Sequence, residues 1–297
     1  MPDTSAPVSP KPHVQALTES QIAEYDEQGF IIARGILPAD LLQELQDVTS
    51  ALWEKGRQIS GSDNYYDIAP GHTAETPLIR RISRPTELHD VYVKTAFDSV
   101  VGDLAADLLG GAVKFYHSKI NFKLPGSKAS DVQWHQDWPH FPHTNFDLLA
   151  VSVPMHARTR DNGCIKAVPG SHRRGPLSTW RDGTYVFTCE DSMTLDDFAN
   201  AVDLEAEPGD VIIHHGLAVH GSKPNPTDSL VTTLTIQYAA ADAFAFTAPV
   251  IDSIHRNAMV RGEPASHARL VAGDIELPPD FSGGYKSLFA SQDEAKR

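Results

Sequence analysis

The chain has 297 residues, of which 41% are hydrophobic and 22% charged, so it is long enough to bury a core without covalent staples. Its net charge of −14 disfavours a nucleic-acid partner, because phosphate binding requires a basic surface. Two cysteines, Cys164 and Cys189, cannot build a disulfide framework, and neither a membrane span nor a signal-like apolar region is present, so we expect free thiols and a cytoplasmic protein.

The first part of the chain predicts helices and one strand. Residues 1–15 are rich in Pro, Ser and Lys without apolar periodicity, which predicts a disordered leader. Thr18 and Gln21 have the spacing of a capping box, so a helix is predicted over residues 18–28, and the run after Gly29 predicts a strand over 30–37.

Further helices precede a β-rich part. A helix is predicted over residues 38–56, a loop over 61–72, and one or two helices over 85–111. From Ala112 onward, short runs rich in β-branched and aromatic residues alternate with turn clusters, which predicts an antiparallel β core. The predicted strands lie within residues 112–124, 148–157, 164–168, 209–216 and 231–239.

A metal site is indicated by His135 and Asp137, which lie two residues apart. If they lie on a strand, alternation directs both side chains to one face, where an imidazole and a carboxylate can share an ion. One such pair is expected by chance among 14 histidines, so the pair alone is a weak signal. A third ligand from a later strand would complete a set that leaves iron positions open, and among His214, His215 and His220 we select His220.

Four motifs together resemble the phytanoyl-CoA dioxygenase family. They are WHQD at 134–137, DNGCIKAVPGSH at 161–172, GD at 209–210 and HGSKPN at 220–225. Their order and spacing match that family, and the resemblance covers nearly all of residues 16–240.

The resemblance implies a mainly β fold with flanking helices, in which a double-stranded β-helix (jelly-roll, cupin-like) core begins at about residue 112. It implies one oxygenase domain over residues 16–297, with Fe(II) bound by His135, Asp137 and His220. The co-substrates would be 2-oxoglutarate and O₂, and the product a hydroxylated or otherwise oxidised metabolite. Related halogenases carry a small residue in place of this carboxylate, so Asp137 favours hydroxylation over halogenation.

Other histidines near the motifs are assigned different roles. One of His214 and His215 is expected in the core and the other as a hydrogen-bond donor to a ligand. His140, His143 and His172 are expected in loops or at the pocket rim rather than at the metal.

The family pattern is broken at Val231, where relatives carry an arginine that anchors the distal carboxylate of 2-oxoglutarate. A buried dicarboxylate without a cation is poorly compensated, so another basic group is needed. The resemblance implies Arg81, Lys119 and Ser222 as co-substrate contacts, with the Arg81 guanidinium able to grip a carboxylate bidentately. Alternatively, Arg81 and Lys119 are solvated charges at a strand edge.

The substrate is expected to be a small molecule, with neither a nucleic acid nor a membrane as partner, and the oligomeric state is left open. Aromatic residues around the first motif either line a pocket or belong to the core, namely Trp134, Trp138, Phe141 and Phe146. Two alternatives remain. One is a metal-binding β-helix protein with altered or lost 2-oxoglutarate use, and the other is a cupin-like isomerase or hydrolase. Residues 245–297 match no motif.

Overall fold

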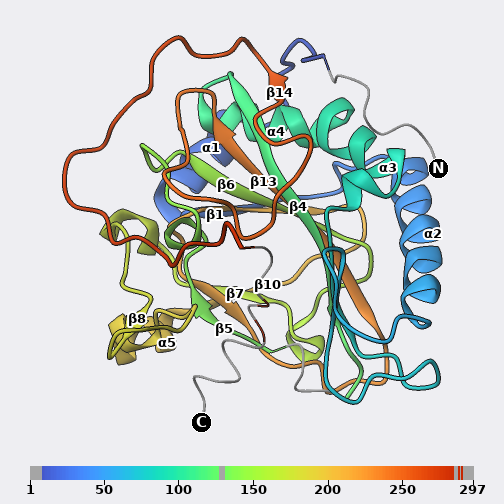
Figure 1. The fold of residues 1–297 in the computed structure, drawn as a ribbon. Coiled ribbons are helices and arrows are strands. Elements are labelled where there is room, and N and C mark those ends of the chain that lie inside the picture. The colour runs from blue at the N-terminus through green and yellow to red at the C-terminus, as the bar shows by residue number, and fades with distance from the viewer. Residues whose placement is uncertain (1–8, 127–130, 284–286, 288, 290–297) are drawn as a thin grey trace.

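Two β-sheets on either side of a cavity form the centre of the molecule (Figure 1). The computed structural model describes residues 9–126, 131–283, 287 and 289. The larger sheet consists of β1 (Phe30–Ala33), β2 (Tyr66–Ile68), β3 (Ile79–Ser83), β4 (Val113–Lys123), β6 (Leu148–Pro154), β11 (Val211–His215), β13 (Val231–Ala240) and β14 (Met259–Arg261). The smaller sheet consists of β5 (Val132–His135), β7 (Ile165–Ala167), β10 (Val202–Leu204) and β12 (His220–Ser222).

The strand order is that of a double-stranded β-helix, as expected. The larger sheet runs β1-β11-β6-β13-β4-β3-β2, with β14 also paired to β4, and the smaller runs β10-β7-β12-β5. All pairs within these two sheets are antiparallel. A separate antiparallel pair joins β8 (Trp180–Arg181) and β9 (Thr184–Tyr185). The fold is therefore mainly β, with helices at its edge.

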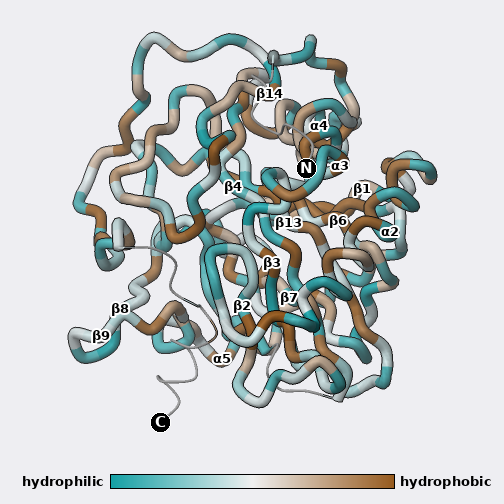
Figure 2. Tube along the Cα trace, turned by 45° about the vertical axis from the view of Figure 1, so that its right-hand side comes forward, coloured by the Kyte–Doolittle hydropathy of each residue, from teal (hydrophilic) through white to brown (hydrophobic). Residues whose placement is uncertain are grey.

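The first four helices pack against the larger sheet and share its core, whereas the fifth lies beside the smaller sheet, where Phe198 packs against Trp134 of β5. They are α1 (Glu19–Gln28), α2 (Ala39–Gly56), α3 (Asp90–Val93), α4 (Val100–Leu109) and α5 (Leu195–Asn200), and a π-helical turn over Lys94–Asp98 joins α3 to α4. In one continuous apolar cluster, Leu45 of α2 and Leu104 of α4 lie with Val151 of β6 and Ile236 of β13. Figure 2 shows hydrophobic residues concentrated along the strands of this sheet, while the outer loops are mainly hydrophilic.

The predicted start and end of α1 are confirmed. Thr18 accepts the N–H of Gln21, whose side chain accepts the N–H of Thr18, so both halves of the capping box are present. Gly29 ends the helix at φ 83°, a left-handed conformation that glycine adopts without a steric penalty. The predicted loop over residues 61–72 differs from the structure in one respect, because it contains β2, whose partner is β3.

The terminal segments lie against the same body. In residues 9–15, expected to belong to a disordered leader, the N–H of Val14 donates to Asp103 and the His13 ring lies 2.6 Å from Asp107, both on α4. The expectation for residues 1–8 falls outside the described residues. Towards the other end, Arg261 of β14 is buried and ion-paired with Asp103.

Two smaller expectations concern the cysteines and membrane spans. Cys164 and Cys189 are buried free thiols, as predicted. Among the described residues, no helix is both long enough and apolar enough to cross a bilayer.

Candidate metal centre and cavity

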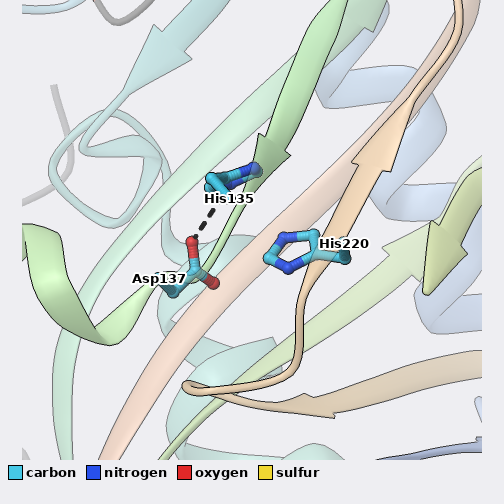
Figure 3. A group of neighbouring side chains, drawn as sticks. All are labelled: His135, Asp137 and His220. Atoms are coloured by element: carbon cyan, nitrogen blue, oxygen red, sulfur yellow. Dashed lines mark ion pairs between the residues drawn. The ribbon is translucent and has the colours of Figure 1, made fainter. Parts of the chain in front are cut away.

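Three buried side chains converge where β5 and β12 lie side by side (Figure 3). His135 is the last residue of β5, His220 is the first of β12, and the two are register partners. One ligand atom of each histidine and one Asp137 oxygen all lie within 4.8 Å of one another. The separation of His135 Nε2 from Asp137 Oδ1 is 3.6 Å.

Asp137 reaches this point differently from the expectation based on strand alternation. β5 ends at His135, and Asp137 has helical angles of φ −73° and ψ −41° at the start of the short 3₁₀ turn Trp138–His140. A strand-to-turn transition therefore directs the carboxylate towards the two imidazoles.

His135 and His220 both form a hydrogen bond through Nδ1, so the same ring nitrogen, Nε2, is available in each. Nδ1 of His135 lies 2.9 Å from the carbonyl of Gln133, and Nδ1 of His220 lies 3.0 Å from the carbonyl of Ala218. Because a carbonyl only accepts, each Nδ1 carries the proton, which leaves the Nε2 lone pair available for a metal. Burial, together with the neighbouring His214 and His135, holds the pKa of His220 well below its usual value, which also favours the neutral ligand form.

Asp137 is oriented by two partners from the larger sheet. Its Oδ2 accepts a 2.6 Å hydrogen bond from Gln237 Nε2 and lies 3.2 Å from His214 Nε2. Burial by itself would raise the pKa of Asp137, but His135, His214 and the charge of Lys119 outweigh it and hold this pKa well below the usual value. The carboxylate is therefore ionised and available as a ligand.

The two histidines of β11 have different surroundings. His214 is buried beside Asp137, whereas the His215 ring packs near Tyr25 and accepts the N–H of Leu217. Gln237 was missed, because no local motif marks a glutamine one hundred residues from its partner.

A cavity of about 90 Å³ opens beside the three side chains. Arg81, Lys119 and Ser222, the three expected co-substrate contacts, all line it. Burial, followed by the charge of Arg81, lowers the pKa of Lys119 to about 8. The reading of Arg81 as a solvated charge does not hold, because its side chain is buried and its Nε donates to Asn121 at 3.0 Å.

Two further basic residues line the same cavity and were not anticipated. Lys123 and Arg158 are both buried. Lys123 could have been found from the sequence, since it lies four residues after Lys119 and so on the same face of β4. Arg158 follows β6 in an irregular segment, and nothing in the local sequence marks it.

A second cavity, of about 40 Å³, is also lined by His135 and Asp137. Arg81 and Lys119 line it as well, and the side chains lining only this cavity include His117, His140, Phe141 and Ile251. Both ring nitrogens of His117 and the Nε2 of His140 are buried without a hydrogen-bond partner among the described residues. Burial, followed by the charge of His135, lowers the pKa of His140 to about 3, so this imidazole is neutral.

The other expected pocket residues have different positions. Trp138 is fully buried and donates to the carbonyl of Asn145, with Phe146 packed against it, so both belong to the core. Trp134 packs against Phe198, away from both cavities. Two of the histidines expected in loops or at the rim line neither cavity, namely His143 and His172.

Comparison with known proteins shows the family of the chain. The model of the phytanoyl-CoA dioxygenase (PhyH) family matches residues 25–230, which include all three converging side chains. The chain belongs to the phytanoyl-CoA dioxygenase family. A probable alpha-ketoglutarate-dependent hypophosphite dioxygenase of Stutzerimonas stutzeri is 30% identical to this family member over 280 residues, covering 92% of this chain and 96% of the relative. A methylphosphonate hydroxylase of Gimesia maris is 29% identical, covering 75% and 81%.

A solved structure supports the same conclusion. The crystal structure of EctD from S. alaskensis with 2-oxoglutarate and 5-hydroxyectoine superposes with a TM-score of 0.66 at 26% identity, covering 90% of this chain and 92% of that one. This phytanoyl-CoA dioxygenase family member is an Fe(II)- and 2-oxoglutarate-dependent dioxygenase that uses O₂ and acts on a small molecule.

Proposed function

We propose that His135, Asp137 and His220 bind the iron. Two imidazole nitrogens and one carboxylate oxygen match the donor set of non-haem Fe(II) oxygenases, which leaves coordination positions open. Bound there, iron with 2-oxoglutarate and O₂ supplies the oxidising chemistry, while the protein orients the reactants and excludes water. A carboxylate at Asp137 favours hydroxylation over halogenation, because it occupies a position that a halide would need.

The iron assignment is tested by His135→Ala. This variant should lose stoichiometric iron after anaerobic loading and gel filtration, as measured by metal analysis. His156→Ala, which removes an exposed histidine, is the matched control and should retain iron. Full iron occupancy in the His135 variant would show that the ligand set is wrong.

Arg81, Lys119 and Ser222 are proposed to contact 2-oxoglutarate in the cavity of about 90 Å³. Ser222 follows the ligand His220 by two residues, and Lys119 lies close enough to Asp137 for its charge to lower the carboxyl pKa. Ser222 and Lys119 therefore line the cavity together with the three proposed iron ligands. Arg81 and Lys119 also line the cavity of about 40 Å³.

The substrate is proposed to be a small phosphorus oxyanion. Among the described residues lining the larger cavity, four are basic, namely Arg81, Lys119, Lys123 and Arg158, whereas Asp137 is the single acidic one. The single observation that carries this proposal is that four basic side chains and one acidic side chain line this cavity among the described residues. Two relatives named for hypophosphite and methylphosphonate support it.

Substrate-dependent succinate release tests this proposal. Hypophosphite, phosphite and methylphosphonate should stimulate 2-oxoglutarate turnover, and dimethyl sulfone, a neutral tetrahedral analogue of similar size, should not. Equal stimulation by the neutral compound, or none by any phosphorus oxyanion, would contradict the proposed substrate class.

Residues 16–297 are proposed to act as one oxygenase domain. The continuous apolar cluster shared by the helices and the larger sheet supports this unit. A cytoplasmic location is proposed on the two reduced, buried cysteines, because reducing compartments keep thiols free. Cell fractionation would test that location.

A further inference from the structure

Arg158 is a buried guanidinium facing the cavity beside the candidate iron ligands. Its side chain is 5% exposed and lines the cavity of about 90 Å³. Its Nη2 donates to the carbonyl of Gly163 at 2.7 Å. No ion pair joins it to a carboxylate within the described part of the chain. A buried cation in this state is costly unless an anion binds beside it.

Lys123 lines the same cavity as Arg158 and lies close enough for the charge of Arg158 to act on it. Its Nζ donates to the carbonyls of Ser222 at 3.3 Å and Lys223 at 2.7 Å. Burial and then the nearby charge of Arg158 hold the pKa of Lys123 well below its usual value, and Asp131 acts in the opposite direction. An anion bound beside Arg158 and Lys123 would favour the charged form of both side chains.

Lys123 lies further along β4 than Lys119, whose charge acts on Asp137. Lys119 and Lys123 lie on one face of β4, four residues or about 13 Å of strand apart. Lys119 lies near Asp137, and Lys123 lies beyond it, at the register position opposite Val231. Ser222, Lys123 and Arg158 line the same cavity as His135, Asp137 and His220, and Lys123 Nζ donates to the carbonyl of Ser222.

We infer that Arg158 and Lys123 together bind the far carboxylate of 2-oxoglutarate. The inference rests on the proposed function of the cavity. In it, the second carboxylate of the co-substrate is bound by Lys123 of β4 and by Arg158 from the segment after β6. The opposed position on β13, Val231, offers no charge. Arg158 presents a planar group with several N–H donors, which can hold a carboxylate bidentately, while Lys123 adds a point charge.

The alternative is that Lys123 and Arg158 only stabilise the fold. Lys123 donates to the carbonyls of residues 222 and 223, and Arg158 donates to the carbonyl of Gly163. Binding of two ligands, 2-oxoglutarate and 2-oxopentanoate, distinguishes an anchor for the far carboxylate from a structural role. 2-Oxopentanoate retains the 2-oxo acid end that meets the metal and lacks only the far carboxylate. Loss of an anchor for that carboxylate weakens 2-oxoglutarate alone, whereas a distorted cavity weakens both ligands.

The experiment is anaerobic isothermal titration calorimetry of the Fe(II)-loaded protein with each ligand. Wild type should bind 2-oxoglutarate much more tightly than 2-oxopentanoate. Arg158→Met and Lys123→Met should each weaken 2-oxoglutarate binding about ten- to a hundred-fold, with 2-oxopentanoate affinity unchanged. Arg158→Lys should recover part of the loss. The matched control is Arg160→Met, an exposed arginine two residues away that pairs with Asp203, and it should behave as wild type.

Three outcomes would overturn the inference. One is unchanged 2-oxoglutarate affinity in both variants, and another is an equal loss for both ligands. The third is loss of the preference for 2-oxoglutarate in Arg81→Met while Arg158→Met retains it, which would make Arg81 the anchor. Wild type that binds neither ligand would instead contradict the proposed function. If Lys123→Met does not fold, the Arg158 variants still decide the question.

Discussion

The orientation and the charge of the Asp137 carboxylate depend on the side chains that contact it. Gln237 Nε2 and His214 Nε2 approach the same oxygen, Oδ2, which leaves Oδ1 directed towards His135. Partners of this kind fix the direction of a ligand and its charge, so their removal affects metal binding without removing a ligand.

Gln237→Leu is therefore expected to lower iron affinity about ten- to a hundred-fold, because Oδ2 loses its shortest hydrogen bond while the side-chain volume is kept. Competition with a chelator under anaerobic conditions measures this affinity. Gln43→Leu changes a glutamine paired with Asp47 on α2 and serves as the control. Equal affinities in the two variants would mean that Gln237 does not position Asp137.

At the scale of elements, the short helix α5 is held by one buried carboxylate. Asp197 completes a capping box with Thr194 and pairs with Arg174 from the turn after β7. The hydrogen bond from Arg174 is the main cause that holds the pKa of Asp197 well below its usual value. A carboxyl whose pKa is lower in the folded state stabilises the fold above its unfolded pKa of about 4 and loses this contribution as the pH falls.

Asp197→Asn should consequently lower the free energy of unfolding by about 1 kcal/mol near pH 7. The difference from wild type should shrink below about pH 4, where the carboxyl of the unfolded wild type becomes protonated. Denaturant unfolding at several pH values measures this. The control is Asp196→Asn, since Asp196 is an exposed neighbour in the same helical turn. A difference that grows on acidification would contradict the assigned sign.

The turn at Gly163 links a motif glycine to the cavity. Gly163 has φ 77°, and an added Cβ would lie 2.3 Å from the carbonyl oxygen of Lys223, which accepts a hydrogen bond from Lys123. Gly183 has nearly the same φ, 75°, but no atom within 4 Å of an added Cβ. The two glycines therefore differ in crowding and not in backbone conformation.

Gly163→Ala should destabilise the protein more than Gly183→Ala, for which only the backbone strain of about 1 kcal/mol applies. It should also weaken 2-oxoglutarate binding, because the carbonyl that holds Lys123 must move. Thermal unfolding and calorimetric titration measure the two effects. Equal stability of the two variants would show that the Lys223 carbonyl is free to shift.

At the scale of the whole molecule, residues 13 and 14 connect the N-terminal segment to α4. Deletion of residues 1–15 removes the contacts of His13 and Val14 with α4, so Asp103 and Asp107 each lose a partner. Deletion of residues 1–8 leaves those contacts in place. We expect the longer deletion to lower the melting temperature by several degrees relative to the shorter one, from the loss of about 1 to 2 kcal/mol. Identical melting curves would mean that these contacts do not contribute to stability.

The sequence by itself determined the parts of this protein that depend on local pattern. A capping box and a following glycine specify both ends of α1, since these interactions span only a few residues. The order of four motifs identified the family and the three side chains that converge in the structure.

Only the tertiary structure decided which other groups surround those side chains. Gln237 meets Asp137 across one hundred residues, and Arg158 reaches the cavity from a segment without a motif. Strand alternation gave the right face for His135 and Asp137, although Asp137 reaches it through a turn after β5. Pairing between strands distant in the sequence brings such groups together, and a single sequence carries no local signal of that pairing.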